Sequence, residues 1–372
     1  MKFGADIDRM TAYCTYCPKM CRFSCPTADA ESRETATPWG MMRLLELAKD
    51  NSVALDHEVA DAFYHCTGCR RCQTYCEHDN DVPRALWKAR RWSVDSGFLP
   101  EAYLDLQQRF DESGTPYGKP ERRIDDTVFD EQAKIAFWPD CSTVANHPDL
   151  VESVGRLLNR LLGSKVQLVR SEEFNHPTCC GFPLTGAGIK TPESCRDDLW
   201  PDLDGIDTVY TDCPGLAAWH HDASSWPIAE RNTDPEFGHI FELIADKCRT
   251  VPPEKTLQLD DRLLHESCYV TRQIDGSDAV GTILAAIQQN PPQQMAYTGD
   301  DSQCCGGRCH YQVLEPEASE HAAEKVLDAL DRKPAADTMV TTSSMCRDAM
   351  ADAGGDEQVT NLLQLICEAY GV

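Results

Sequence analysis

The sequence predicts an α + α/β protein, with a helical N-terminal domain followed by two duplicated α/β domains. Within the first 100 residues, two runs of four cysteines stand between segments with helical patterns. From about residue 133, short apolar segments that end near a cysteine alternate with helix-length segments, as in α/β folds. This second pattern occurs twice, at an offset of about 125–130 residues, which predicts that one α/β unit was duplicated.

Composition and periodicity predict the domain boundaries. The helical domain includes a segment in which Thr37 is suited to N-cap a helix and Pro38 to occupy its first position. The stretch after residue 100 is rich in Asp, Pro and Gly and is predicted to be a linker. The helical domain, the linker and the two α/β domains are expected at residues 1–100, 101–132, 133–255 and 256–372.

Each α/β copy begins with an apolar strand that leads to a cysteine, "KIAFWPDC" at 134–141 and "DRLLHESC" at 261–268. A helix-length segment and a Cys-Cys-Gly sequence follow in both copies. Further on, "DTVYTDCPGL" at 207–216 aligns without a gap on "DTMVTTSSMC" at 337–346. Four cysteines therefore align in each copy: Cys141, Cys179, Cys180 and Cys213 in the first, and Cys268, Cys304, Cys305 and Cys346 in the second.

The chain has twenty cysteines and a net charge of −26, and both values limit the functions that it can have. No apolar run is long enough to span a bilayer and no leader opens the chain, so we expect a cytoplasmic protein in which clustered cysteines bind metal. The isolated Cys195, Cys248 and Cys367 fit buried, inert thiols. The negative charge argues against nucleic acid as a partner, because phosphates would be repelled.

The later of the N-terminal runs has the bacterial ferredoxin spacing C-x2-C-x2-C-x3-C, at Cys66, Cys69, Cys72 and Cys76. The earlier run has one extra residue in its middle and a proline after its last cysteine, at Cys14, Cys17, Cys21 and Cys25. In such pairs three thiolates hold one cube, and the fourth reaches the neighbouring cube. This predicts two [4Fe–4S] clusters with crossed ligation, one on Cys14, Cys17, Cys21 and Cys76 and the other on Cys25, Cys66, Cys69 and Cys72.

Zinc is the alternative metal for these runs, but structural zinc prefers two separated cysteine pairs. Glu77 stands where proline usually follows the fourth cysteine. Nearby aromatic residues are expected either to shield the clusters from water or to pack ordinarily, at Tyr13, Tyr16 and Tyr75. A set of basic residues forms either a docking patch for a partner or a solvated helix face, at Arg70, Arg71, Arg84, Lys88, Arg90 and Arg91.

In the α/β half the chain resembles the cysteine-rich CCG family, through the segments "WPDC", "HPTCCGFP", "DCPG", "LHESCY", "QCCGG" and "SSMC". That family includes the catalytic subunits of heterodisulfide reductase. It also includes the iron–sulfur subunits of glycolate oxidase, lactate utilisation enzymes and anaerobic glycerol-3-phosphate dehydrogenase. Together with the ferredoxin-like runs, the resemblance covers nearly the whole chain.

The family pattern has five thiolates per copy, which in heterodisulfide reductases hold a noncubane [4Fe–4S] cluster that cleaves a disulfide. Here Leu216 replaces one of them in the first copy and Ser343 replaces another in the second. Four thiolates remain, enough for an ordinary cube or for zinc, unless Ser343 or Cys309 completes the set. We expect one or two further iron–sulfur clusters; the alternative is a copy without metal. Flanking histidines are expected to hydrogen-bond or pack rather than to ligate, at His176, His265 and His310.

The resemblance implies an iron–sulfur electron-transfer subunit of a multisubunit oxidoreductase, for which electron transfer is favoured over substrate turnover by this chain. Its partners would be a flavoprotein dehydrogenase or other redox subunit and a quinone-linked or other redox acceptor. A membrane-bound quinone-reactive partner would place the cytoplasmic chain at the inner face of the membrane. The alternative is a catalytic heterodisulfide or disulfide reductase subunit with a cluster as its active site. A third possibility is a non-redox scaffold with zinc in the CCG blocks.

Overall fold

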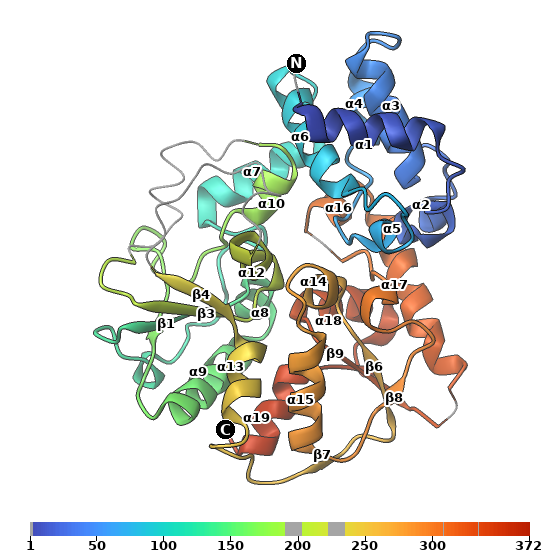
Figure 1. Ribbon diagram of the computed structural model, residues 1–372. Helices are drawn as coiled ribbons and strands as arrows, with labels where there is room; N and C mark the ends of the chain where they lie inside the picture. Colours follow the sequence, from blue (N-terminus) through green and yellow to red (C-terminus); the bar gives the residue numbers. More distant parts are fainter. Residues whose placement is uncertain (1–2, 190–202, 222–234, 308, 334) are drawn as a thin grey trace.

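A computed structural model describes residues 3–189, 203–221, 235–307, 309–333 and 335–372. It confirms the predicted mixture of a helical N-terminal part and parallel sheets (Figure 1). Within the described ranges, none of the helices has the length and apolar character needed to cross a bilayer.

Short helices surround the N-terminal cysteines. Helix α3 begins as its sequence predicts, because the Thr37 side chain accepts a hydrogen bond from the Gly40 N–H at 3.0 Å and Pro38 occupies the first turn. Trp87 and Leu86 of α6 are fully buried against α3 and α4. The helices of this part are α1 (Ala5–Tyr16), α2 (Pro26–Glu31), α3 (Pro38–Lys49), α4 (His57–Ala62), α5 (Arg71–Thr74) and α6 (Val82–Asp95).

The predicted linker at 101–132 is wrong in its first half, because α7 (Ala102–Ser113) forms there. Tyr103, Leu106 and Phe110 recur at spacings of three and four residues and are buried, which anchors the helix in the core. Ser113 and Gly114 end it, with Gly114 in the left-handed conformation. The segment is therefore an integral part of the fold.

The first parallel sheet has the strand order β2-β1-β3-β4. Its strands are β1 (Ile135–Trp138), β2 (Gln167–Leu168), β3 (Thr208–Thr211) and β4 (Glu236–His239). The pairing of β1 with β3 sets Trp138 opposite Thr211. The associated helices are α8 (Cys141–Asn146), α9 (Pro148–Leu162), α10 (Phe182–Gly186), α12 (Pro214–His221) and α13 (Ile240–Lys247).

The second parallel sheet has the order β8-β6-β9-β10, so its strands follow one another as in the first sheet. Its strands are β6 (Arg262–His265), β8 (Gln293–Gln294), β9 (Thr338–Thr341) and β10 (Val359–Asn361), and β5 (Leu257–Gln258) pairs separately with β7 (Gln288–Asn290). The helices are α14 (Cys268–Arg272), α15 (Ser277–Ile287), α16 (Cys309–Leu314), α17 (Pro316–Asp331), α18 (Ser344–Met350) and α19 (Leu362–Tyr370).

The two sheet units pack through helices in a reciprocal way. Helix α13 packs on α15 and α9 packs on α19, between the two sheets in Figure 1. At the cysteine-bearing ends, α8 contacts α18 and α12 contacts α14. Polar groups join α8 to α18, since Asp348 accepts hydrogen bonds from Asn146 and pairs with His147, each at 2.7 Å. The duplication itself stays a prediction.

Candidate metal centres

One group of thiols in the N-terminal part, called the outer group, consists of Cys14, Cys17, Cys21 and Cys76. These four cysteines line a cavity of about 200 Å³, which Cys72 also reaches. Burial, together with the charges of the three other members, raises the pKa of the Cys14 thiol to about 12. The Asn80 amide donates to the Cys14 sulfur at 3.4 Å. Cys76 from the later run thus lies with the earlier run, which is the grouping that crossed ligation requires.

A second group of thiols, called the inner group, consists of Cys25, Cys66, Cys69 and Cys72. They line a cavity of about 20 Å³. Burial raises the pKa of Cys25 to about 12, with further contributions from Cys69 and Cys66. Gly68, with φ of 79°, makes the turn between Cys66 and Cys69, and its N–H donates to the Cys66 sulfur at 3.3 Å.

In the first sheet unit, Cys141 begins α8 just after β1, and Cys213 comes two residues after β3. Because β1 and β3 are parallel neighbours, both cysteines leave the sheet at its carboxyl edge. Cys180 shares hydrogen bonds with Cys179 and Cys213, and the bond with Cys179 raises the pKa of the Cys180 thiol well above its usual value. All four cysteines are buried in one core cluster.

The second sheet unit brings its four cysteines together in the same way. Cys268 begins α14 after β6, and Cys346 lies in α18 after the neighbouring strand β9. The Cys304 thiol shares a hydrogen bond with Cys268, and this bond raises the pKa of Cys304. Cys305 shares one with Cys346, which raises the pKa of the Cys305 thiol well above its usual value.

These four groups fit metal–thiolate clusters by their donors and surroundings. Bare thiols packed in this way are kept protonated by burial and by mutual repulsion. A bound cation reverses that balance, since it attracts the thiolate charge that the neighbours repel. The arrangement therefore suits thiols that are deprotonated when they bind a metal ion.

The two positions of the missing fifth thiolate have different side chains in different surroundings. Leu216 is buried in α12, and its N–H donates to the Cys213 sulfur at 3.4 Å. Ser343 is buried directly before α18, two residues after β9, where Cys213 stands after β3. The side chain of Cys309 and the whole of Cys195 lie outside the described residues.

The other described cysteines and flanking histidines are buried or hydrogen-bonded within the protein. The expected burial of Cys248 and Cys367 is confirmed, with exposed fractions of 6% and 3%. His265 is hydrogen-bonded through both ring nitrogens, to the Thr341 hydroxyl and the Gln303 carbonyl, each at 3.0 Å. The His176 ring lies 2.9 Å from the Pro177 carbonyl. The side chain of His310 is not among those described.

Both interpretations of the basic set are wrong for its most buried members. Arg90 is fully buried in α6 and donates to the carbonyls of Phe63, Gly186 and Cys66 at 2.6–2.8 Å. Arg71 is also buried. These side chains satisfy backbone carbonyls behind the inner group and offer no docking face.

The three tyrosines near the outer group differ in their surroundings, and Tyr75 lines the same cavity as the thiols. Tyr16 is 89% exposed, so its ring is too exposed to shield the thiols. Tyr13 is 46% exposed and packs on His78, with the two rings stacked 4.7 Å apart. Met20 and Phe23, which lie between the outer-group cysteines in the sequence, are exposed as well. Tyr75 makes an edge-on contact with Phe23, with ring centroids 5.0 Å apart. Apolar surface is thus concentrated around this group.

The inner group touches the second sheet unit directly. Cys69 and Cys304 share a hydrogen bond, which raises the pKa of the Cys69 thiol. This contact could not be predicted from spacing, because the two residues belong to separate motifs.

Helix α14 secures the contact. The Tyr269 hydroxyl donates to the Thr67 carbonyl at 3.1 Å, and the Gln273 amide donates to the Gly68 carbonyl at 2.8 Å. Arg272 donates to the Cys69 carbonyl at 2.6 Å. Every backbone carbonyl from Thr67 to Cys69 therefore accepts a side-chain hydrogen bond from α14 or from Gln273, which directly follows it.

Comparison with protein families agrees with this geometry at both ends of the chain. A 4Fe-4S dicluster domain matches residues 10–80, which contain the inner and outer groups. A cysteine-rich domain of the CCG type matches residues 263–351, which contain the four cysteines of the second sheet unit. No curated protein matches the chain. The chain therefore carries a 4Fe-4S dicluster domain at residues 10–80 and a CCG cysteine-rich domain at residues 263–351.

Proposed function

We propose that the chain is the iron–sulfur electron-transfer subunit of a multisubunit oxidoreductase. The iron–sulfur domains indicate a redox or electron-transfer role. The observation that carries the proposal is the contact between Cys69 and Cys304, because it joins the dicluster domain to a second thiol group without intervening residues. When bound, iron–sulfur clusters supply one-electron carriers whose potentials depend on burial, charge and hydrogen bonds to sulfur.

Two [4Fe–4S] clusters would be held by the outer and inner groups with crossed ligation, and one or two further clusters by the cysteines of the sheet units. The equal strand order and the reciprocal helix packing of the two units support a duplicated CCG domain at 133–255 and 256–372. With four thiolates in each unit, ordinary cubes are the better fit than five-ligand noncubane clusters.

The outer group supplies the surface through which a partner would exchange electrons. Segment 9–28 contains Arg9, Lys19 and Arg22 and no acidic residue, on a chain with a net charge of −26. Tyr16, Met20 and Phe23 add exposed apolar surface around the cysteines. Lys19 and Arg22 both pair with Glu34, at 3.2 and 2.8 Å, so the exposed apolar side chains are the feature that suits a redox partner. The resemblance of the sequence makes a flavoprotein dehydrogenase the proposed donor and a quinone-linked protein the proposed acceptor.

The test uses the full chain purified without oxygen. An anaerobic titration with dithionite should show uptake of at least about three electrons, one for each of three [4Fe–4S] clusters. The reduced protein should pass them to a soluble quinone, and a flavoprotein should co-purify from the native host. Absence of reducible clusters would overturn the proposal, and so would heterodisulfide turnover on the order of 1 per second or faster.

A further inference from the structure

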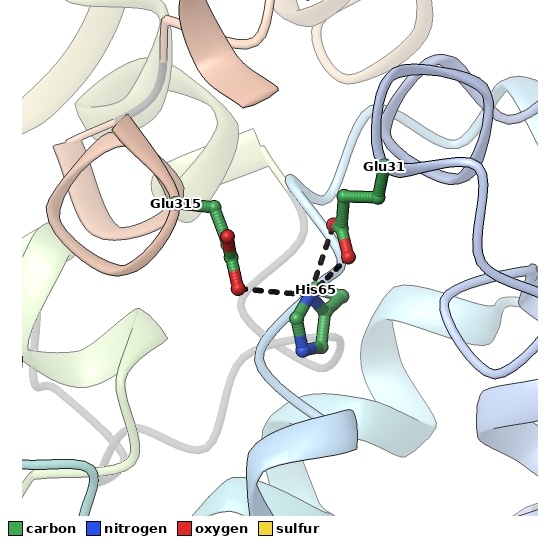
Figure 2. A group of neighbouring side chains, drawn as sticks. All are labelled: Glu31, His65 and Glu315. Carbon is green, nitrogen blue, oxygen red and sulfur yellow. Dashed lines mark hydrogen bonds and ion pairs between the residues drawn. The ribbon is translucent and has the colours of Figure 1, made fainter. Parts of the chain in front are cut away.

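A cluster of one histidine and two glutamates lies where three parts of the chain meet (Figure 2). Glu31 ends α2, His65 directly precedes Cys66, and Glu315 stands at the start of α17. His65 Nδ1 lies 2.9 Å from both carboxylate oxygens of Glu31 and 3.8 Å from Glu315 Oε1. One donor atom from each of the three side chains lies within 4.8 Å of the others.

The second ring nitrogen of His65 has its own carboxylate. His65 Nε2 lies 3.1 Å from Asp61, one helical turn away. A histidine that binds a metal through one nitrogen typically donates the other N–H to a carboxylate, which orients the ring. His65 is fully buried, so this orientation is fixed by packing. The imidazole is therefore arranged as a metal ligand would be.

Glu31 provides an independent sign of a missing ligand. Its side chain is 4% exposed. Tyr311 donates to Oε1 at 2.8 Å. Oε2 is buried and forms no hydrogen bond of its own among the described residues, because the His65 Nδ1 that lies 2.9 Å from it is hydrogen-bonded to Oε1. Arg33 approaches Oε2 only to 3.6 Å, from a side chain that is 45% exposed. A buried carboxylate oxygen without a hydrogen bond is costly, and a cation in this place would satisfy it.

Charge and distance both suit a divalent ion. Asp61, Glu31 and Glu315 bring three carboxylates to one imidazole. A protonated imidazole supplies a single positive charge, whereas a divalent ion supplies two. Tetrahedral zinc with bonds of about 2.0–2.1 Å to nitrogen and oxygen needs ligand atoms about 3.3 Å apart. The observed separations of 2.9 and 3.8 Å lie on either side of that value.

We propose that Glu31, His65 and Glu315 bind a divalent transition-metal ion of the zinc class, with water completing its coordination. The mixed nitrogen and oxygen donors suit zinc better than magnesium or calcium. The ion would join the dicluster domain to α17 of the second sheet unit, beside the inner group. The site uses no cysteine, so it stands independently of the proposed electron transfer.

The test measures zinc bound to the full chain with its iron–sulfur clusters intact. After treatment with a chelator, the protein is dialysed against Zn²⁺ and examined by metal analysis and X-ray absorption at the zinc edge. We expect one zinc ion with nitrogen and oxygen ligands at about 2.0–2.2 Å and no sulfur at about 2.3 Å. A shell containing sulfur, or protein without bound zinc, would leave His65 as a protonated partner of Glu31 and overturn the proposal.

Variants locate the ion. Glu315→Gln keeps the shape of a side chain that is one-third exposed, so it should fold and bind Zn²⁺ at least tenfold more weakly. Asp61→Asn should weaken binding about 10–100-fold, as loss of a carboxylate behind a metal ligand does. Glu324→Gln is the matched control, because it removes a carboxylate 3.2 Å from the exposed His321. Equal zinc affinity in wild type and Glu315→Gln would contradict the assignment.

Discussion

Cys69 of the dicluster domain and Cys304 of the second sheet unit share a hydrogen bond. Thr67 also lies beside this pair, with its hydroxyl 3.6 Å from the Cys304 sulfur. The contact makes the second unit a direct neighbour of the inner group. Clusters on these thiols would therefore be direct neighbours, whereas the outer group faces solvent through Tyr16 and Phe23.

Crossed ligation predicts that a cysteine substitution in one run affects the cluster bound mainly by the other run. Cys76→Ser should disturb the cluster of the outer group, where the pKa of Cys14 is raised partly by Cys76. Cys25→Ser should disturb the cluster of the inner group, where Cys25 lies beside Cys69 and Cys66. EPR spectra of the two reduced variants separate these effects. If Cys76→Ser altered only the inner cluster, ligation would follow the sequence runs instead.

Gly68→Ala should destabilise the protein around the inner group by more than the cost of placing alanine in a left-handed backbone conformation. Gly68 and Gly97 both have positive φ, at 79° and 85°, but only at Gly68 would an added methyl clash with the Tyr269 hydroxyl. Gly97→Ala, the control, has open space and should cost about 1–2 kcal/mol. Iron retention and the midpoint of thermal unfolding check the comparison. Equal decreases in iron content and thermal midpoint in the two variants would show that the Tyr269 side chain can move aside without a loss of stability.

The exposed apolar surface of the outer group should matter for a partner and not for the fold. Tyr16→Ser and Phe23→Ser remove side chains that are 89% and 65% exposed. We expect unchanged iron content and thermal midpoint, and at least a tenfold loss of affinity for the flavoprotein that co-purifies. Leu104→Ser, at 53% exposure on α7, is the control. If Leu104→Ser weakened the binding of the flavoprotein as much as the other two variants, the claim that the partner docks at the outer group would be contradicted.

His239 should make stability fall in mild acid. Burial lowers the pKa of His239 to about 4, while its Nδ1 accepts a hydrogen bond from the Phe241 N–H at 3.2 Å at the start of α13. Below pH 6.5 the His239 imidazole becomes protonated in the unfolded chain but stays neutral in the folded chain. The free energy of unfolding therefore decreases as the pH falls towards 4. Between pH 6.5 and 5 the loss should be about 2 kcal/mol.

His239→Asn keeps a capping side chain and removes the titrating group. Urea unfolding at pH 6.5 and 5 should therefore show a smaller acid loss in the variant than in wild type. If the two proteins lost the same stability, other groups would account for the acid sensitivity.

The sequence predicts those features that depend on local spacing. Strands that end near cysteines and the helix begun by Thr37 follow from patterns within about ten residues. The linker prediction failed because turn-forming residues further along obscured the apolar face of α7. The basic set was misjudged for a similar reason, since Arg90 shares a helix face with Leu86 and Val82, both buried.

Contacts between distant segments could not be predicted in this way. The meeting of Cys69 with Cys304, and of Glu31 and His65 with Glu315, depends on how the dicluster domain packs on α14 and α17. Neither residue type nor spacing reveals such packing. His65 carried one weak sign, because Asp61 precedes it by one helical turn.

The most direct test of the account compares the full chain with a variant in which four cysteines are replaced, Cys268→Ser, Cys304→Ser, Cys305→Ser and Cys346→Ser. Iron and sulfide are counted, and the EPR spectrum of the reduced proteins is recorded. We predict that the variant loses about four irons while at least about eight remain, and that magnetic broadening of the inner cluster by its neighbour disappears. Unchanged iron content and an unchanged inner-cluster signal would contradict an electron path from Cys69 to Cys304.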